Sequence, residues 1–109
     1  MESFSTIKDL QRSLRKKELS SKELVCSYLD NIDDKDVSVN SFITIDREFS
    51  LKQAEHADKM FANGTATPMT GIPIAHKDIF CTKGLTTTCG SKMLQNFVPT
   101  YNATIINKL

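Results

Sequence analysis

Gly71-Ile72-Pro73-Ile74-Ala75-His76-Lys77-Asp78-Ile79-Phe80 is the stretch that decides the fold of this 109-residue chain. Its apolar residues are typical of a buried strand, and Pro73, which cannot donate a ladder hydrogen bond, suits the first residue of that strand. Side chains alternate between the two faces of a strand, so Ala75, Lys77 and Ile79 share one face. Lys77 is therefore predicted to lie among apolar neighbours.

A lysine in this position has two interpretations. The side chain can lie at a strand end and extend its amine into water. Alternatively, Lys77 is held in a dry site, where burial can lower a lysine pKa by up to ~3–5 units and let the neutral amine accept a proton near pH 7. A neutral amine of this kind needs hydroxyl partners, such as a relay of serines. The residues alone leave both interpretations open.

Helices are predicted before this strand. The first begins after Ser5 and ends near Lys17 or Glu18, because three apolar residues recur at helical spacing: Ile7, Leu10 and Leu14. Ser20 and Glu23 have the spacing of a capping box, which predicts the start of a second helix. Its apolar stripe comprises Leu24, Val25, Tyr28, Leu29 and Ile32. We expect this helix to end in a solvated acidic turn at Asp33, Asp34 and Asp36.

Val39 to Ile45 is predicted to be a short strand, since it contains a cluster of β-branched and aromatic residues. Asp46 is the expected cap of a third helix that ends at Asn63-Gly64, where glycine suits the left-handed position. This helix should turn four residues inward: Phe49, Ala54, Ala57 and Phe61.

Beyond the central strand, Thr82 to Gly84 is predicted to be a turn and Leu85 to Cys89 an extended segment. Ser91 is the predicted cap of a short helix through Met93, Leu94 and Phe97. Asn102 is the predicted cap of a last helix whose residues are still apolar where the sequence stops. We therefore expect residues 1–109 to be the N-terminal portion of a single domain whose C-terminal remainder is missing.

Composition indicates a folded protein with no general affinity for polyanions. Hydrophobic residues make up 39% of the chain and charged residues 25%, and 14 basic against 13 acidic residues leave a net charge of +1. The N-terminus lacks the features of a signal peptide, and no stretch approaches the ~18 apolar residues of a membrane span. We expect a cytoplasmic protein without membrane contact.

Other catalytic chemistries have little support. Cys26, Cys81 and Cys89 lack paired metal or redox spacing and are predicted to be reduced, mostly buried thiols. His56 is predicted to be exposed on the third helix, and His76 to face away from Lys77, so a histidine-based hydrolase is disfavoured. The sequence predicts no metal site and no cofactor-binding residue.

The run Gly71 to Asp78 resembles the lysine-bearing strand of the amidase signature family, whose active site is a serine, cis-serine and lysine triad. Residues 82–94, 96–98 and 101–104 resemble one branch of that family, the A subunits of glutamyl-tRNA(Gln) amidotransferases. The chain departs from the pattern at His76, where an aliphatic residue is commoner, and at Ile79-Phe80, which replaces a commoner polar step.

The resemblance implies an α/β fold, with a mixed central β-sheet flanked by helices, of which this chain would be the truncated N-terminal part. It implies that Lys77 is the relay base, while both serines of the triad would follow beyond residue 109. Because only the base is present, we expect the 109-residue chain alone to be inactive.

In that branch, the A subunit releases ammonia from glutamine, and the B subunit uses ATP and Mg²⁺ to activate glutamate on misacylated tRNA. The A, B and C subunits form the heterotrimer that serves protein biosynthesis. Two alternatives remain: another amidase-signature hydrolase of small amides, which would share Lys77, or a short non-catalytic protein that binds a partner through its apolar helix faces.

Overall fold

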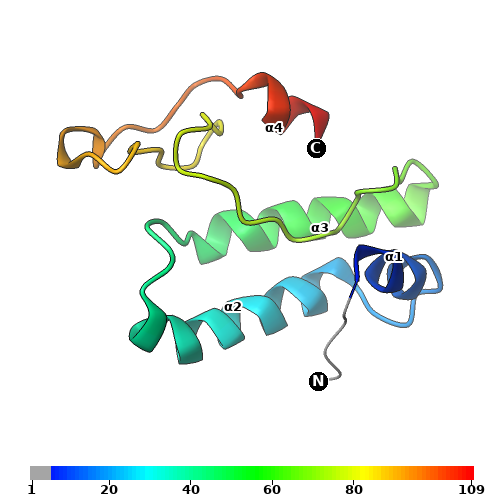
Figure 1. Cartoon of the computed structure of the whole chain (residues 1–109). Helices are drawn as coiled ribbons and strands as arrows, with labels where there is room; N and C mark the ends of the chain where they lie inside the picture. The colour runs from blue at the N-terminus through cyan, green and yellow to red at the C-terminus, as the bar shows by residue number, and fades with distance from the viewer. Residues whose placement is uncertain (1–5) are drawn as a thin grey trace.

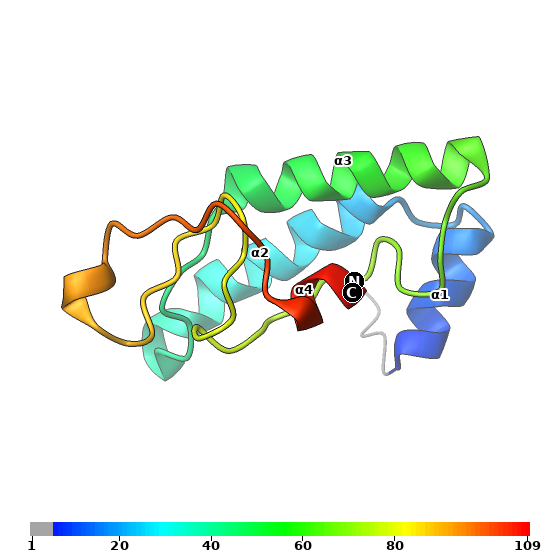
Figure 2. The same ribbon diagram turned by 90° about the horizontal axis from the view of Figure 1, so that it is seen from above.

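A computed structural model describes residues 6–109. Its elements are α1 (Ile7–Arg15), α2 (Ser21–Val39), α3 (Arg47–Asn63), the 3-10 helix η1 (Lys92–Leu94) and α4 (Thr104–Lys108). Helices α2 and α3 form an antiparallel pair, and α1 lies at the end where α2 begins and α3 ends (Figure 1). Residues 65–80 then run back along this pair to its other end, where residues 80–103 form loops that include η1 (Figure 2).

The helix starts follow the predicted capping residues. Ser20 and Glu23 form the capping box, with Ser20 Oγ accepting from the Glu23 N–H and the Glu23 carboxylate accepting from the Ser20 N–H. Asp46 accepts from the Phe49 N–H at 2.8 Å at the start of α3. Gly64 ends α3 in the left-handed conformation with φ 71°. These local signals were confirmed because each cap is satisfied within its own turn.

Two small clusters of buried side chains hold the helices together. The first joins α1 to α2 through Leu10, Leu14 and Leu24, with Leu19, Tyr28, Phe61 and Ile72 packed against it. The second joins α2 to α3 through Val25, Leu29 and Ala54, with Leu51 beside it. The core is therefore made by one face of each helix, as the helical spacing predicted.

The predicted acidic turn after the second helix is wrong, because α2 continues to Val39. Asp33 lies inside the helix and accepts from Arg47 at 3.0 Å, and Asp30 also pairs with Arg47. The Asp36 carboxylate accepts from the Ser41 N–H at 2.7 Å. The carboxylates of Asp30, Asp33 and Asp36 accept from groups at the start of α3 or in the loop beyond α2. They therefore do not form a solvated turn that ends the helix.

The predicted strands do not form within residues 6–109. Residues 39–45, 72–80 and 85–89 contain no strand, and the described residues hold one isolated bridge, between Thr82 and Leu85. Residues 73–76 make no backbone-to-backbone hydrogen bond with any other described residue. A strand is stable only when its backbone groups are paired with a neighbour. The described residues supply no such neighbour, so they do not confirm the expected mixed sheet.

The junction between α2 and α3 depends on Asp58. Its carboxylate accepts from the Ser21 N–H at 2.7 Å and from the Lys22 N–H at 3.1 Å, so a side chain of α3 satisfies the free N–H groups at the start of α2. Ser21 is 1% exposed, and its hydroxyl donates to the carbonyl of Gly71 at 3.1 Å. Ser21 therefore binds both α3, through Asp58, and the chain segment that follows α3, through Gly71.

Replacing Asp58 with Ala should destabilise the chain by about 1–2 kcal/mol, because the buried Ser21 N–H loses its acceptor. Urea unfolding followed by circular dichroism measures the difference. Glu55→Ala is the matched control on the same helix. It removes only the exposed Lys22–Glu55 ion pair of 2.7 Å, which water screens, and should therefore cost much less stability than Asp58→Ala. Equal losses in the two variants would contradict this role of Asp58.

Candidate functional site

Lys77 lies in a turn on the surface of the described structure. Its carbonyl accepts from the Phe80 N–H at 3.2 Å, and its side chain is exposed. His76 is also exposed, and its ring nitrogens lie 3.3 Å from the Lys77 carbonyl oxygen and 3.2 Å from Thr82 Oγ1. The dry setting that a lysine base requires is not formed by the described residues, and the catalytic role of Lys77 stays a prediction.

The lysine segment, defined here as residues 71–80, is fixed at its upstream end by Gly71. This glycine has φ +81°, which favours glycine over any other residue. A Cβ atom placed on it would lie 3.1 Å from the Phe61 ring and 3.2 Å from the Ser21 side chain. Ile72 then packs against the cluster of Leu10, Leu14 and Leu24. The segment therefore leaves the helical core at a fixed point.

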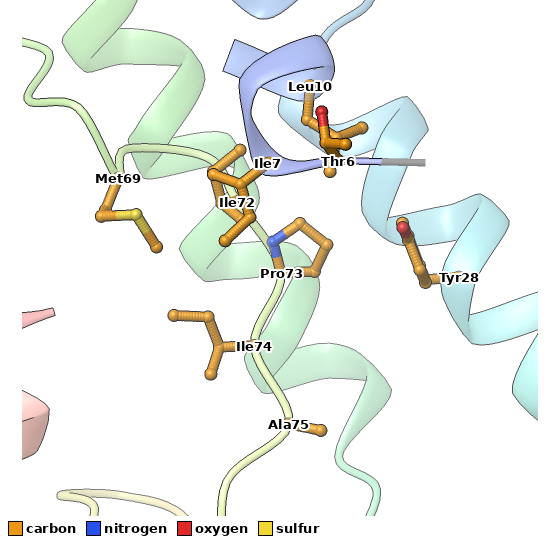
Figure 3. A pocket seen from close by; sticks show the side chains of 9 residues that line it. All are labelled: Thr6, Ile7, Leu10, Tyr28, Met69, Ile72, Pro73, Ile74 and Ala75. Carbon is orange, nitrogen blue, oxygen red and sulfur yellow. The ribbon is translucent and has the colours of Figure 1, made fainter. Parts of the chain in front are cut away.

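An open, mostly apolar pocket of about 470 Å³ lies beside the upstream half of the lysine segment (Figure 3). In the close-up, Ile7 and Ile72 lie on one side of Pro73 and Tyr28 lies on the other, while Ile74 and Ala75 continue along the segment. The nine lining residues are Thr6, Ile7, Leu10, Tyr28, Met69, Ile72, Pro73, Ile74 and Ala75. Lys77 is outside this set.

At its downstream end the lysine segment is fixed by Asp78. The Asp78 carboxylate accepts from the Thr88 N–H at 2.9 Å and also from the Thr88 hydroxyl. The Asp78 carbonyl accepts from the Cys89 N–H at 2.8 Å. Thr88 is 8% exposed, so these bonds lie partly away from water. The residue after Lys77 is thus joined to a chain segment ten positions further on.

The backbone that receives Asp78 is bent into an unusual shape. Cys89 has φ 52° and Gly90 has φ 71°, so two successive residues lie in the left-handed region. For a non-glycine residue this conformation costs about 1–2 kcal/mol. The Gly90 N–H donates to Thr88 Oγ1 at 3.2 Å. The contacts of Asp78 and Thr88 oppose the cost of this bend.

The surroundings of Asp78 favour its charged form. Partial burial raises the pKa of this carboxyl. Hydrogen bonds from the Thr88 hydroxyl, the Thr88 N–H and the Gly90 N–H, together with the nearby His76, lower the pKa by more than burial raises it. The net effect holds the pKa of Asp78 below its ordinary value. Asp78 is therefore a carboxylate at neutral pH and accepts hydrogen bonds only.

The remaining predicted residues have structural positions. Ser91 accepts from the Met93 N–H at 3.2 Å and caps η1, which is shorter than the predicted helix. The prediction that Asn102 caps the last helix is wrong. Its side chain accepts from the Lys83 N–H at 2.7 Å and donates to Asn107 at 3.0 Å, and Ala103 is the N-cap.

His56 is exposed, as predicted. The three cysteines are free thiols, but Cys89 is exposed and the other two are partly buried, so the prediction that most are buried is wrong. In residues 6–109 no group of three or more His, Cys, Asp or Glu side chains is placed to hold a metal ion. No helix in the same range is long and apolar enough to cross a membrane.

The contacts of Asp58 and Asp78 were not predicted from the sequence. Both carboxylates bind partners that lie far along the chain, 37 and ten positions away. A usable signal for the second contact was the run Thr86-Thr87-Thr88-Cys89-Gly90, because threonines before a glycine are typical of a bend whose hydroxyl and N–H groups are free to donate.

Comparison with known proteins identifies the family of the chain and several similar proteins. The Amidase family profile matches residues 23–109. Curated proteins named as the A subunit of glutamyl-tRNA(Gln) amidotransferase are 50% identical over 105 residues in Azoarcus sp. (strain BH72) and 51% identical over 105 residues in Dechloromonas aromatica (strain RCB). Each alignment covers 96% of this chain and 22% of the relative, so the chain spans about a fifth of their length.

Solved structures also match the chain, and one of them shows its fold. It is described as a vestigial protein complex that reveals the evolutionary origins of an s-triazine catabolic enzyme, in an inhibitor-bound complex. The two chains superpose with a TM-score of 0.83 at 23% identity, over 94% of this chain and 23% of the other. At this identity the similarity shows the fold alone.

The pH dependence of stability tests the Asp78 contacts. A carboxyl whose pKa is lowered by folding stabilises the fold above about pH 4, and this contribution is lost as the pH falls through its folded pKa. The Asp78→Asn variant should therefore be less stable than the unmodified chain at pH 6, and the gap should narrow below pH 4.

Unfolding free energies measured by urea titration at a series of pH values give this gap. Asp34→Asn removes a charge from the exposed surface of α2 and controls for the change in net charge. A gap that stays constant from pH 6 to pH 3 would contradict the assignment.

Proposed function

The chain belongs to the amidase family, and we propose that it forms the lysine-bearing N-terminal segment of the glutamine-hydrolysing A subunit of a glutamyl-tRNA(Gln) amidotransferase. The observation that supports this most strongly is the identity of about half of its residues to proteins of that name, over 96% of the chain. The aligned range includes the fixed lysine segment and the Thr88–Gly90 bend that receives Asp78.

In the proposed reaction Lys77 is the base of a serine, cis-serine and lysine relay. It accepts, through the cis-serine, the proton of the nucleophilic serine, which then attacks the amide carbon of glutamine. The proton passes to the leaving nitrogen, ammonia departs, and water hydrolyses the acyl-enzyme to glutamate. Both serines and the groups that stabilise the oxyanion would come from parts of the enzyme outside these residues.

The extended backbone before Lys77 supports a place for this segment in a sheet. Residues 73–76 make no backbone-to-backbone hydrogen bond with another described residue, and Ile74 is 43% exposed. Unpaired N–H and C=O groups beside an apolar side chain favour pairing with further strands. We propose that these strands belong to the mixed central sheet of the complete enzyme and give Lys77 the dry site that its chemistry needs.

The proposed enzyme acts in a complex. Ammonia released by the A subunit would pass to the B subunit, which would use ATP and Mg²⁺ to activate the glutamate of misacylated Glu-tRNA(Gln), and the C subunit would complete the heterotrimer. This segment would bind none of the ATP or Mg²⁺. Because the product is an aminoacyl-tRNA for protein biosynthesis, we place the complex in the cytoplasm.

The substitution Lys77→Met in the complete enzyme should abolish glutamine hydrolysis, because methionine keeps the length of the side chain but cannot accept a proton. The expected loss is at least about 100-fold in kcat, within the range attributed to a general base. Ammonia release from glutamine measures it, and gel filtration shows whether the complex still assembles.

Lys83→Met is the matched control, since Lys83 is an exposed lysine in the neighbouring turn whose N–H bonds to Asn102. Its activity should equal that of the unmodified enzyme. An assembled Lys77→Met enzyme that hydrolyses glutamine at the normal rate would remove Lys77 from the mechanism.

A further inference from the structure

We propose that Asp78 is a positioning residue for Lys77 and that it acts by binding Thr88. This inference rests on the proposed function, because it assumes that Lys77 takes part in the reaction. Asp78 follows Lys77 directly, and both of its carboxylate oxygens accept from Thr88, one from the N–H at 2.9 Å and the other from the hydroxyl. The carboxylate therefore joins the lysine to a second, separate part of the chain.

The connection between Asp78 and the lysine is short and rigid. The Lys77 carbonyl accepts from the Phe80 N–H at 3.2 Å, which closes a turn over residues 77–80. The Thr82 hydroxyl donates to the Phe80 carbonyl at 3.2 Å and holds the next step of the chain. Within this turn Asp78 is the residue with two separate contacts to the Thr88–Gly90 bend, one from its side chain and one from its carbonyl.

The upstream half of the lysine segment cannot replace this contact. Gly71 and Ile72 are fixed against the helices, but residues 73–76 make no backbone-to-backbone hydrogen bond with another described residue. Four extended residues can span about 13 Å, so a fixed Gly71 leaves the position of Lys77 loosely determined. The position of the lysine backbone is therefore set from its downstream side, by Asp78.

The receiving bend is adapted to this carboxylate. Thr88 and Cys89 donate two successive N–H groups to the carboxylate and the carbonyl of the same residue, Asp78, and Cys89 itself lies in the left-handed region at φ 52°. A strained backbone persists only where its surroundings hold it. The left-handed conformation of Cys89 and the hydrogen bonds to Asp78 are two separate observations. Both indicate a fixed distance between the turn at residues 77–80 and residues 88–90.

Thr88 allows the contact to be altered without touching Asp78 or Lys77. Thr88→Val in the complete enzyme removes the hydroxyl donor and keeps the shape of the side chain, whereas Thr88→Ser keeps the hydroxyl. We expect Thr88→Val to lower kcat for glutamine hydrolysis about 10- to 100-fold with little change in KM, because a misplaced base slows the chemical step. Thr88→Ser should restore kcat to within about threefold of normal.

Thr87→Val is the matched control. Thr87 is 3% exposed, and its hydroxyl donates to the Leu85 carbonyl at 3.2 Å, so this variant also loses a buried threonine hydroxyl but none of the bonds to Asp78. Its kcat should stay close to normal. Asp78→Asn, which weakens both bonds at once, should lower kcat at least as much as Thr88→Val.

The outcomes separate this inference from the proposed function. If Lys77→Met is inactive and Thr88→Val has a normal kcat, the positioning role of Asp78 is overturned while the proposed function stands. If Thr87→Val and Thr88→Val lose kcat equally, or if Thr88→Ser fails to restore it, the effect is general destabilisation and the inference is also overturned. If Lys77→Met retains hydrolysis, Lys77 is not the base and the positioning role of Asp78 falls with it. If the unmodified complete enzyme releases no ammonia from glutamine, the proposed function fails. If the Asp78→Asn protein does not fold, the Thr88 variants alone decide whether Asp78 has the positioning role.

Discussion

The buried hydroxyl and N–H of Ser21 are the contacts on which the rest of the structure depends. Its N–H binds Asp58 of α3 at 2.7 Å, and its hydroxyl binds the Gly71 carbonyl at 3.1 Å. Three parts of the chain, namely α2, α3 and the lysine segment, therefore meet at a residue that is 1% exposed. Gly71 must be a glycine here, because a side chain on it would crowd Ser21 and Phe61. The helices thus act as the support from which the lysine segment extends.

The proposed role of Lys77 as a base requires a fixed position as well as a dry site, and the bonds at the two ends of the lysine segment bear on the first requirement. The lysine segment is held upstream by Gly71 and Ile72 and downstream by the bonds between Asp78 and Thr88. Between these two points residues 73–76 make no backbone-to-backbone hydrogen bond with another described residue, so their N–H and C=O groups can pair with further strands. The chain therefore holds the backbone around Lys77 at two points, and we propose that the rest of the enzyme supplies the serines and excludes water.

Local signals in the sequence predicted the helices well, because Ser20, Asp46 and Gly64 act within one turn of the chain. The strands were not predictable in the same way. The alternation in residues 72–80 describes a segment suited to pairing, but a strand also needs a neighbour, which is a property of the whole fold. Lys77 was found through the family pattern. Asp58 and Asp78 were missed, because their partners are set by tertiary packing and not by spacing.

Native-state hydrogen exchange of the Thr88 and Cys89 amides in the 109-residue chain tests most directly whether Asp78 fixes the lysine segment. Both amides donate to Asp78, whereas the amides of Ile74 and Ala75 have no backbone acceptor among residues 6–109. The account predicts that Thr88 and Cys89 exchange at least about tenfold more slowly than Ile74 and Ala75, and that Asp78→Asn removes most of the protection of Thr88. Equal exchange rates for all four amides, or full protection of Thr88 in Asp78→Asn, would contradict it.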